Sequence, residues 1–267
     1  MSKTIVITGS TRGIGKGLAK AFLERDCQVV VSGRGAEAVA AVVSELEGGA
    51  PGRVSGQACD VTDAEQVQAL WDHAAERFGR VDVWINNAGI SVPRKPFQEL
   101  NPAQVAGVVD TNLIGAAQCC RVAIAGMLAQ GGGQVWNMEG FGSGGQMQPG
   151  MAAYGASKRA VNYLNKALAK EVKDTAVQVC ALSPGIVVTD LLVGDYDLSS
   201  PEWQKSKKIF NILGDTVDTV TPWLADGVLK TNKNGASVAW LTGGKAFRRF
   251  MTAGFNKRDL FADIEGA

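Results

Sequence analysis

Residues 8–15 read Thr8-Gly9-Ser10-Thr11-Arg12-Gly13-Ile14-Gly15, and they follow the apolar run Thr4–Thr8. The residues after this turn, to about 25, have the apolar spacing of an amphipathic helix. A glycine-rich turn that joins a strand to a helix predicts a dinucleotide-binding site. The three glycines would allow a tight turn, close approach of a pyrophosphate and close packing of the helix. We therefore expect a helix N-terminus that binds a diphosphate through Gly9, Ser10, Arg12, Gly13, Ile14 and Gly15.

The same alternation of short apolar runs and helical segments continues along the chain. The predicted strands are Thr4–Thr8, Gln28–Ser32, Arg53–Ala58, Val81–Asn86, Gln134–Asn137, Val177–Leu182 and Ser237–Leu241. The predicted helices lie near 13–25, 36–47, 63–78, 102–129, 151–172 and 216–230. β-Branched runs separated by helices are typical of a parallel sheet that is buried on both faces. The sequence thus predicts an α/β fold, a single doubly wound Rossmann domain over 1–267 with a seven-stranded parallel sheet and helices on both faces.

The composition of the 267 residues is that of a globular protein, with 46% hydrophobic residues, 20% charged residues and a net charge of +1. This balance gives no reason to expect a nucleic-acid partner. The five cysteines show no paired spacing, so we expect reduced thiols and a cytoplasmic location. We expect no targeting peptide before the first strand, no apolar stretch of membrane-spanning length and, with His73 as the lone histidine, no metal site.

Three segments interrupt the alternation. Residues 140–150 form a glycine-rich loop, 190–215 form a long excursion, and 243–267 form a tail. Long insertions in compact domains are usually lids or binding loops. We expect 190–215 to be a lid at the carboxyl edge of the sheet, where open α/β folds bind ligands.

The end of the second predicted strand indicates which dinucleotide is bound. An NAD site usually has a carboxylate there, but this chain has Arg34 and no acid. Arg34 and Arg12 could both reach a 2′-phosphate, although each could also be an ordinary solvated arginine. The missing carboxylate favours NADP(H).

Two further segments end neighbouring strands. Asp60-Val61 could bind the adenine amino group, or Asp60 could be a turn or capping aspartate. Asn87-Ala88-Gly89 could let the backbone meet the adenosine ribose, or could simply end the strand.

Tyr154 and Lys158 lie four residues apart in the predicted helix 151–172, and residues with this spacing share one helix face. An ammonium near a phenol favours the phenolate and so lowers the pKa of the phenol. Such a phenol can exchange a proton with an alcohol or a carbonyl oxygen. Together with a hydride carrier, the pair predicts an oxidoreductase that acts on small-molecule carbonyl or alcohol substrates.

These motifs occur in an order that resembles the short-chain dehydrogenase/reductase family. The resemblance rests on the glycine turn, Asn86–Gly89, Asn112, Tyr154 with Lys158, and the run Pro184-Gly185-Ile186-Val187-x-Thr189. It implies that Tyr154 is the general acid/base, that Lys158 binds the nicotinamide ribose, and that Asn112 holds a water of a proton relay. It also implies that Thr189 and the backbone of Ile186–Val187 clamp the nicotinamide end, with Pro184 and Gly185 in the same cofactor-binding run. From the residues alone, Pro184-Gly185 could also be a strand-ending turn. From the residues alone, Asn112 could equally be a capping or kink asparagine.

One position departs from the family pattern. The family usually has a serine thirteen residues before the tyrosine, and Phe141 stands there in this chain. We expect Ser143 to replace it as the residue that binds the substrate oxygen; the alternative is that Tyr154 alone holds this oxygen.

The run 137–145 and the segment 183–192 are similar to the chlorophyll(ide) b reductase branch of the family. That branch uses NADPH to reduce the 7-formyl group of chlorophyll(ide) b, so the resemblance implies a carbonyl substrate that is large and apolar, although another carbonyl substrate is equally open. It also implies a homodimer or homotetramer built on the helices 102–129 and 151–172. The alternative function is a non-catalytic NADP(H)-binding scaffold.

The tail mixes phenylalanines with basic residues over Lys245–Phe261. Such a tail could contact a membrane surface peripherally or cover a large substrate. It could also be a terminal segment packed on the sheet or on a second subunit.

Overall fold

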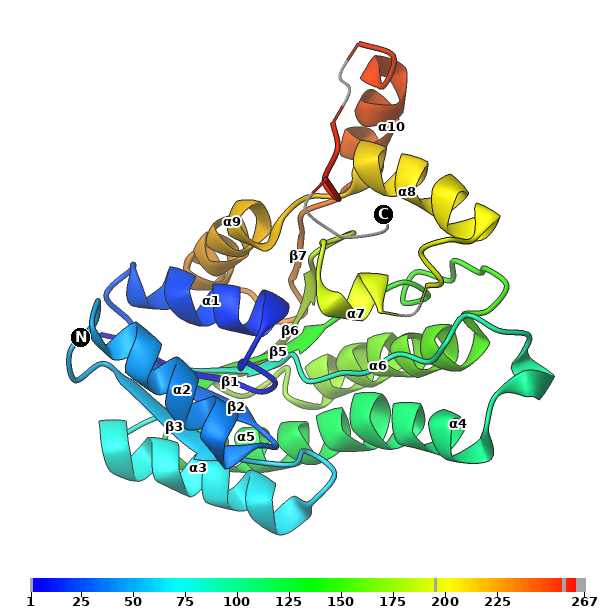
Figure 1. The fold of residues 1–267 in the computed structure, drawn as a ribbon. Helices are drawn as coiled ribbons and strands as arrows, with labels where there is room; N and C mark the ends of the chain where they lie inside the picture. The colour runs from blue at the N-terminus through cyan, green and yellow to red at the C-terminus, as the bar shows by residue number, and fades with distance from the viewer. Residues whose placement is uncertain (1, 195, 256–257, 263–267) are drawn as a thin grey trace.

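The computed structural model describes residues 2–194, 196–255 and 258–262, and Figure 1 shows a twisted sheet between two layers of helices. All six strand pairs are parallel, in the order β3-β2-β1-β4-β5-β6-β7. The strands are β1 Thr4–Ile7, β2 Gln28–Gly33, β3 Val54–Ala58, β4 Val83–Asn86, β5 Gly133–Met138, β6 Val177–Ser183 and β7 Ser237–Ala239. The predicted seven-stranded Rossmann architecture is confirmed.

Alternation along β1 divides the core into two layers. Ile5 and Ile7 pack on one face of the sheet, and Val6 packs on the other. The first face is covered by α1 Gly13–Leu23, α2 Ala36–Glu47 and α9 Val217–Lys230. The second face is covered by α3 Ala64–Phe78, α5 Ala116–Ala129 and α6 Ala152–Glu171.

The helix predicted over 102–129 has an irregular middle. It consists of α4 Pro102–Val109, a π-helical segment Asp110–Gly115, and α5, and it follows a short 3₁₀ turn at Phe97–Glu99. By length and composition alone this 28-residue run could cross a membrane, with an 18-residue window of mean hydropathy 1.4. The expectation that no apolar stretch reaches this length was therefore wrong. The inner face of α5 packs on the sheet through Cys119, Cys120, Val122, Ala123 and Met127, as a core helix does.

The inserted segments contain three helices that the sequence pattern did not predict. These are α7 Asp190–Val193, α8 Pro201–Leu213 and α10 Gly243–Thr252. Helix α8 begins with Pro201 at its first position and with a side-chain cap from Ser200. Figure 1 shows α7 and α8 above the end of α6, and α10 projecting away from the sheet. The aromatic residues Trp203, Phe210 and Phe261 join α8 to the end of the chain in a small separate core.

Candidate active site

The glycine turn lies between β1 and α1, beside the end of β4. Gly9 has a φ of 62°, and a Cβ there would lie 2.8 Å from the Cα of Ala88. Gly13 has a φ of 53°, and a Cβ there would touch the methyl group of Thr189 at 3.5 Å. Both positions therefore favour glycine, because side chains are strained at positive φ and Gly9 also lacks the space. The turn faces Ala88 on one side and Thr189 on the other.

The first turn of α1 fits a diphosphate. Its N-cap residue Arg12 makes no side-chain capping hydrogen bond, and the first turn contains no acidic residue. The opening N–H groups of a helix have no partner within the helix, and they carry a partial positive charge. Ser10 is turned inward instead, because its hydroxyl donates to Ile7 O at 2.7 Å and accepts from Ser32 N at 2.8 Å. The backbone of this turn, rather than its serine hydroxyl, is thus available to an anion.

Asn87 holds the glycine turn against the end of β4 through hydrogen bonds. Its Nδ2 donates to Thr8 O at 2.9 Å and to Gly9 O at 2.8 Å. The backbone N–H groups of Asn87 and Ala88 both donate to the Thr8 hydroxyl at 3.1 Å. The segment Asn87–Gly89 therefore holds the shape of the glycine turn, whatever it contributes to a ribose.

The two predicted phosphate-binding arginines lie in different settings. Arg34 is exposed after β2, while Arg12 forms an exposed ion pair with Asp190 at 3.4 Å. An exposed pair of this kind is weak and does not fix Arg12 in place. Asp60 forms a turn in which Oδ1 accepts from the N–H and the hydroxyl of Thr62. The cap of α3 is Asp63, so Asp60 is a turn aspartate and not a helix cap.

Tyr154 and Lys158 share one face of α6, as their four-residue spacing predicted, and both lie beside Gly140. A Cβ on Gly140 would overlap the Tyr154 hydroxyl and would lie 3.3 Å from Cε of Lys158. The Lys158 ammonium lies 5.8 Å from the centroid of the Tyr154 ring. It also lies 3.6 Å from the place of a Cβ on Gly89, at the end of β4. The phenol and the amine are thus next to the segment that is predicted to bind the dinucleotide.

Burial lowers the pKa of Lys158 to about 8, and the negative charge of Glu139 opposes this by raising it. Lys158 is almost fully buried, and its Nζ donates to Met138 O at 3.2 Å. Removing an ammonium from water disfavours the charged form. Glu139 is held nearby because its Oε1 accepts from Nδ2 of Asn162 at 2.5 Å. A lysine with a pKa near neutrality can change its charge in response to small changes around it.

Asn112 lies in the π-helical segment and is buried. Its Oδ1 accepts from Ile90 N at 2.8 Å, and its Nδ2 donates to Ile90 O at 2.9 Å and to the Ser157 hydroxyl at 3.1 Å. Segments of π-helix are frequent at functional sites. Asn112 therefore joins the loop after β4 to the residue that precedes Lys158, and its expected role in a proton relay stays a prediction.

No serine stands at the position that the family spacing predicts, and the loop after β5 brings a glycine to the Tyr154 hydroxyl. Counting thirteen residues back from Tyr154 gives Phe141, but the residue beside the Tyr154 hydroxyl is Gly140. Ser143 is buried, and its hydroxyl donates to Lys158 O at 3.2 Å and accepts from Gly140 N at 3.1 Å. A hydroxyl has a single hydrogen to donate. In this arrangement Ser143 supports the loop, and its expected contact with a substrate oxygen stays a prediction.

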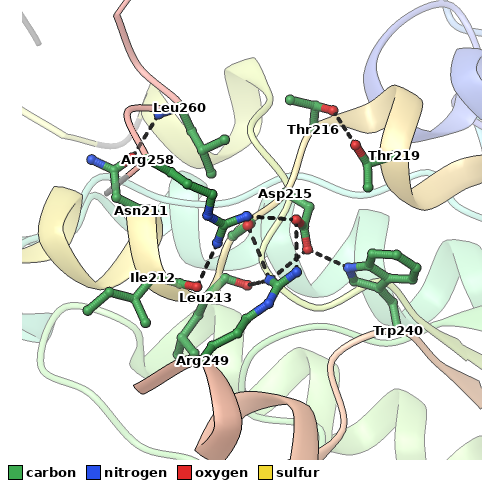
Figure 2. Close-up of polar contacts among 11 residues, drawn as sticks. Asn211, Ile212, Leu213, Asp215, Thr216, Thr219, Trp240, Arg249, Arg258 and Leu260 are labelled. Carbon is green, nitrogen blue, oxygen red and sulfur yellow. Dashed lines mark hydrogen bonds and ion pairs between the residues drawn. The ribbon is translucent and has the colours of Figure 1, made fainter. Parts of the chain in front are cut away.

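The run 184–189, called the strap from here on, leaves the end of β6 and is held by Asp215. Asp215 N donates to Ile186 O, and Val188 N donates to Asp215 O, both at 3.0 Å. Its buried carboxylate accepts from Nε1 of Trp240 at 2.6 Å, and it forms ion pairs with Arg249 and Arg258 (Figure 2). Burial raises the pKa of Asp215, but the hydrogen bonds from Arg249 and Trp240 outweigh it and leave this pKa below its usual value.

Sequence reasoning did not find Gly140 or Asp215. Gly140 was missed because its proximity to the Tyr154 hydroxyl depends on how the 140–150 loop folds, which the sequence pattern does not give. Asp215 lay in a predicted loop, and its partners are 25 to 43 residues further along. His73 hydrogen-bonds the Ser55 hydroxyl at 2.8 Å, and across 2–194, 196–255 and 258–262 no three His, Cys, Asp or Glu side chains are grouped to hold a metal.

Comparison with known proteins connects this geometry to one group of enzymes. A family model described as short chain dehydrogenase matches residues 3–197. The chlorophyll(ide) b reductase NOL, chloroplastic, of Arabidopsis thaliana is 37% identical over 257 residues, which cover 93% of this chain and 72% of the relative. The probable chlorophyll(ide) b reductase NYC1, chloroplastic, of Oryza sativa subsp. japonica is 34% identical over 281 residues, which cover 99% of this chain. The chain spans about half the length of that relative, 54%.

Solved structures agree with the fold. The structure described as ElxO with NADP bound has a TM-score of 0.79 and 28% identity, covering 92% of this chain and 99% of that one. Levodione reductase has a TM-score of 0.82 at 24% identity, covering 91% of this chain and 98% of that one, and this likeness shows the fold alone.

Proposed function

Because the chain belongs to the short chain dehydrogenase family, we propose that it is an NADPH-dependent reductase that converts an aldehyde or ketone to an alcohol. The convergence of Tyr154 and Lys158 beside Gly89 and Gly140 carries this proposal. It brings a proton donor and a positive charge next to Gly89, in the segment after β4 that is proposed to bind the dinucleotide. A non-catalytic scaffold would have no need for this arrangement.

In the proposed mechanism, the nicotinamide cofactor supplies a hydride to the carbonyl carbon when it is bound. Tyr154 donates its phenolic proton to the oxygen as negative charge develops there. The Lys158 ammonium stabilises the tyrosinate that remains, and preorganised charge of this kind is usually the largest contribution to catalysis. Glu139 favours the charged form of Lys158 by raising its pKa. We keep Ser143 as the proposed second contact to the substrate oxygen; the alternative is that Ser143 only supports the loop through its hydrogen bonds to Lys158 O and Gly140 N and that Tyr154 alone holds this oxygen.

We propose NADP(H) rather than NAD(H) as the cofactor. Arg34 after β2 and the absence of a carboxylate there support this choice. Several similar structures are described as bound to NADP, ElxO among them. The strap residues Pro184–Thr189 face the glycine turn through Thr189 and Gly13, which supports a role in holding the nicotinamide end.

We propose a formyl group on a large aromatic compound as the first substrate to test, with the 7-formyl group of chlorophyll(ide) b as the model compound. The support is the printed activity of the relatives, which belongs to those proteins. We further propose that the chain acts as one catalytic domain with a lid at 190–215, and that it forms a homo-oligomer. Exposed apolar side chains on the 102–129 and 151–172 helices support the last point: Ile114, Leu128 and Tyr163. The cytoplasmic location stays a prediction.

The decisive experiment replaces the phenolic hydroxyl. Tyr154→Phe is expected to lower kcat for reduction of an aldehyde and ketone panel by about 10²–10⁴-fold, with NADPH affinity unchanged. Loss of NADPH absorbance measures turnover, and calorimetric titration measures binding. Tyr163→Phe, on the same helix but exposed, is the matched control. Turnover by Tyr154→Phe at the wild-type rate would refute the mechanism, and no turnover of any carbonyl by the wild type would favour the scaffold.

A further inference from the structure

Three residues that contact one another near the proposed active site each have a buried polar atom without a hydrogen-bond partner. Of five such atoms in the described part of the chain, three are Arg94 Nε, Tyr196 Oη and Trp203 Nε1. Cζ of Arg94 lies 4.2 Å from the centroid of the Tyr196 ring, and this ring lies 5.2 Å from that of Trp203. Buried polar groups are nearly always hydrogen-bonded, because leaving them unpaired costs free energy. A group of three adjacent exceptions therefore indicates a place where a ligand supplies the partner.

This cluster joins two segments that flank the proposed reaction. Arg94 lies in the loop after β4, and its Cα would be 3.2 Å from a Cβ on Gly150, four residues before Tyr154. Tyr196 and Trp203 belong to the α7–α8 segment, which begins directly after the strap. The cation–π contact thus connects the loop that packs against Gly150, four residues before Tyr154, to the predicted lid.

All three groups can donate a hydrogen bond, so a ligand that pairs with them must be a hydrogen-bond acceptor. The guanidinium N–H and the indole N–H only donate hydrogen bonds, and a phenol can donate as well. Arg94 forms no ion pair within the ranges that the structure describes, so its positive charge has no acidic partner there. The planar fork of a guanidinium matches the geometry of a carboxylate. The natural complement of this cluster is an oxyanion.

The cluster is also held in place before any ligand arrives. Trp203 is completely buried, and its ring centroid lies 5.1 Å from that of Phe261 and 6.3 Å from that of Phe210. Rigid groups lose little conformational entropy on binding. The donors are therefore preorganised.

We propose that Arg94, with the Tyr196 hydroxyl, binds a carboxylate on the carbonyl substrate, while the buried Trp203 ring holds Tyr196 in place. The inference rests on the proposed reductase function and specifies its substrate class: carbonyl compounds that carry a carboxylate at a distance from the reacting group. Arg94 is a substrate-binding residue in this scheme, since it contacts a remote group rather than the reacting atoms. Its interaction is made in the ground state and in the transition state alike, so losing it raises KM and leaves kcat nearly unchanged.

The test uses pairs of substrates that differ only in charge: 3- and 4-formylbenzoate, longer formyl-aryl acids, and their methyl esters. The wild type is expected to show a higher kcat/KM for at least one acid than for its ester. Arg94→Gln is expected to lower kcat/KM for that acid by at least about tenfold through KM, and to leave the ester unchanged. Lys95→Gln, the exposed neighbouring cation, is the matched control and should behave as the wild type. Tyr196→Phe, which removes one hydroxyl, should give a smaller loss for the acid.

A binding experiment separates this inference from the function on which it rests. The alcohol product acids, such as 4-(hydroxymethyl)benzoate, are titrated calorimetrically into wild-type protein and into Arg94→Gln, each with NADPH present. Binding that is lost only in Arg94→Gln supports the anion site even if no carbonyl is turned over, in which case the proposed reductase function alone fails. Equal handling of acids and esters by the wild type, or an equal loss for both in Arg94→Gln, overturns the carboxylate site.

Discussion

Arg249 and Asp215 form a two-point ion pair, in which Nη1 and Nη2 of Arg249 donate to Oδ2 and Oδ1 of Asp215 at 2.7 and 3.0 Å. The Asp215 side chain is only 6% exposed, and Arg258 and Trp240 donate to the same carboxylate. The backbone of Asp215 is bonded to the strap at Ile186 and Val188. One residue therefore connects the end of the chain to the segment that is proposed to hold the nicotinamide.

Asp215→Asn is expected to destabilise the protein by about 3 kcal/mol, the size typical of removing one partner from a buried ion pair. The two guanidinium groups would remain together without their counter-charge. Denaturant unfolding measures this change. Arg248→Gln, which removes the exposed arginine next to Arg249, is the control and should change stability by less than about 0.5 kcal/mol. A stability for Asp215→Asn equal to that of the control would show that the ion pair contributes nothing.

The same carboxylate predicts how stability depends on pH. Because the pKa of Asp215 is lower in the folded protein than in the unfolded chain, folding is favoured above the unfolded-state pKa of about 4. This contribution is lost as the pH falls through the folded-state value. The difference in stability between wild type and Asp215→Asn should therefore shrink in acid and be constant near neutrality. A difference that stays the same down to acid pH would contradict the assignment.

The lowered pKa of Lys158 predicts how kcat/KM changes with pH on the alkaline side. Its pKa of about 8 means that the ammonium is present below pH 8 and is lost as the pH rises, so kcat/KM should decline there. Glu139→Gln removes the carboxylate that raises this pKa, so the decline should begin at lower pH. Glu171→Gln, an exposed acid at the end of the same helix as Lys158, should leave the profile unmoved. Coincident profiles for Glu139→Gln and wild type would exclude this coupling.

The close approach of Gly140 to the Tyr154 hydroxyl predicts that a larger side chain at position 140 would displace this phenol. In Gly140→Ala the new Cβ would overlap the Tyr154 hydroxyl, so the phenol must move away from the substrate oxygen. A misplacement of about 1 Å can lower kcat by about 100-fold, and dinucleotide affinity should be retained. Gly144→Ala is the control, because its Cβ would meet only the movable end of the Gln146 side chain. A kcat for Gly140→Ala equal to that of the wild type would show that the added methyl group does not displace the Tyr154 phenol.

Arg34 predicts cofactor preference. Arg34→Gln should reduce the ratio of kcat/KM for NADPH over NADH by about tenfold, since a hydrogen bond to a charged group contributes roughly 1.5–3 kcal/mol. Steady-state kinetics with both cofactors provide the ratio. Lys20→Gln, an exposed cation on α1, should not change it. A wild-type protein that prefers NADH would overturn the choice of NADP(H) altogether.

Local signals in the sequence predicted the sheet and most of its helices. The inner strands β1 and β2 are easy to recognise because a strand buried on both faces of a parallel sheet favours consecutive β-branched residues, as at Gln28–Gly33. The glycine turn then marks the boundary between β1 and α1. The spacing of Tyr154 and Lys158 likewise depends only on the pitch of one helix. These features could be predicted because their causes are close together in the chain.

Other features depend on contacts between distant segments. The place of Gly140 beside Tyr154 is set by how the 140–150 loop folds back on α6, which counting residues along the chain cannot give. The helices α7 and α8 were missed because their apolar residues pack on one another and on Phe261 instead of on the sheet. Helix α10 was missed because it buries no residue and leaves Phe247, Phe250 and Met251 exposed. The role of Asp215 follows from partners that meet only in the folded protein.

Because the Trp203 side chain is buried, a spectroscopic signal from its indole would report movement of the proposed lid at 190–215. Trp203 is one of six tryptophans, and it lies on α8 among the aromatic rings of Phe210 and Phe261. Protein labelled with 5-fluorotryptophan would show its fluorine resonance shift whenever α8 lifted and let water reach the indole. Replacing this residue with phenylalanine identifies the line, and adding nucleotide or formylbenzoate would then reveal, in one spectrum, which of them holds the segment closed.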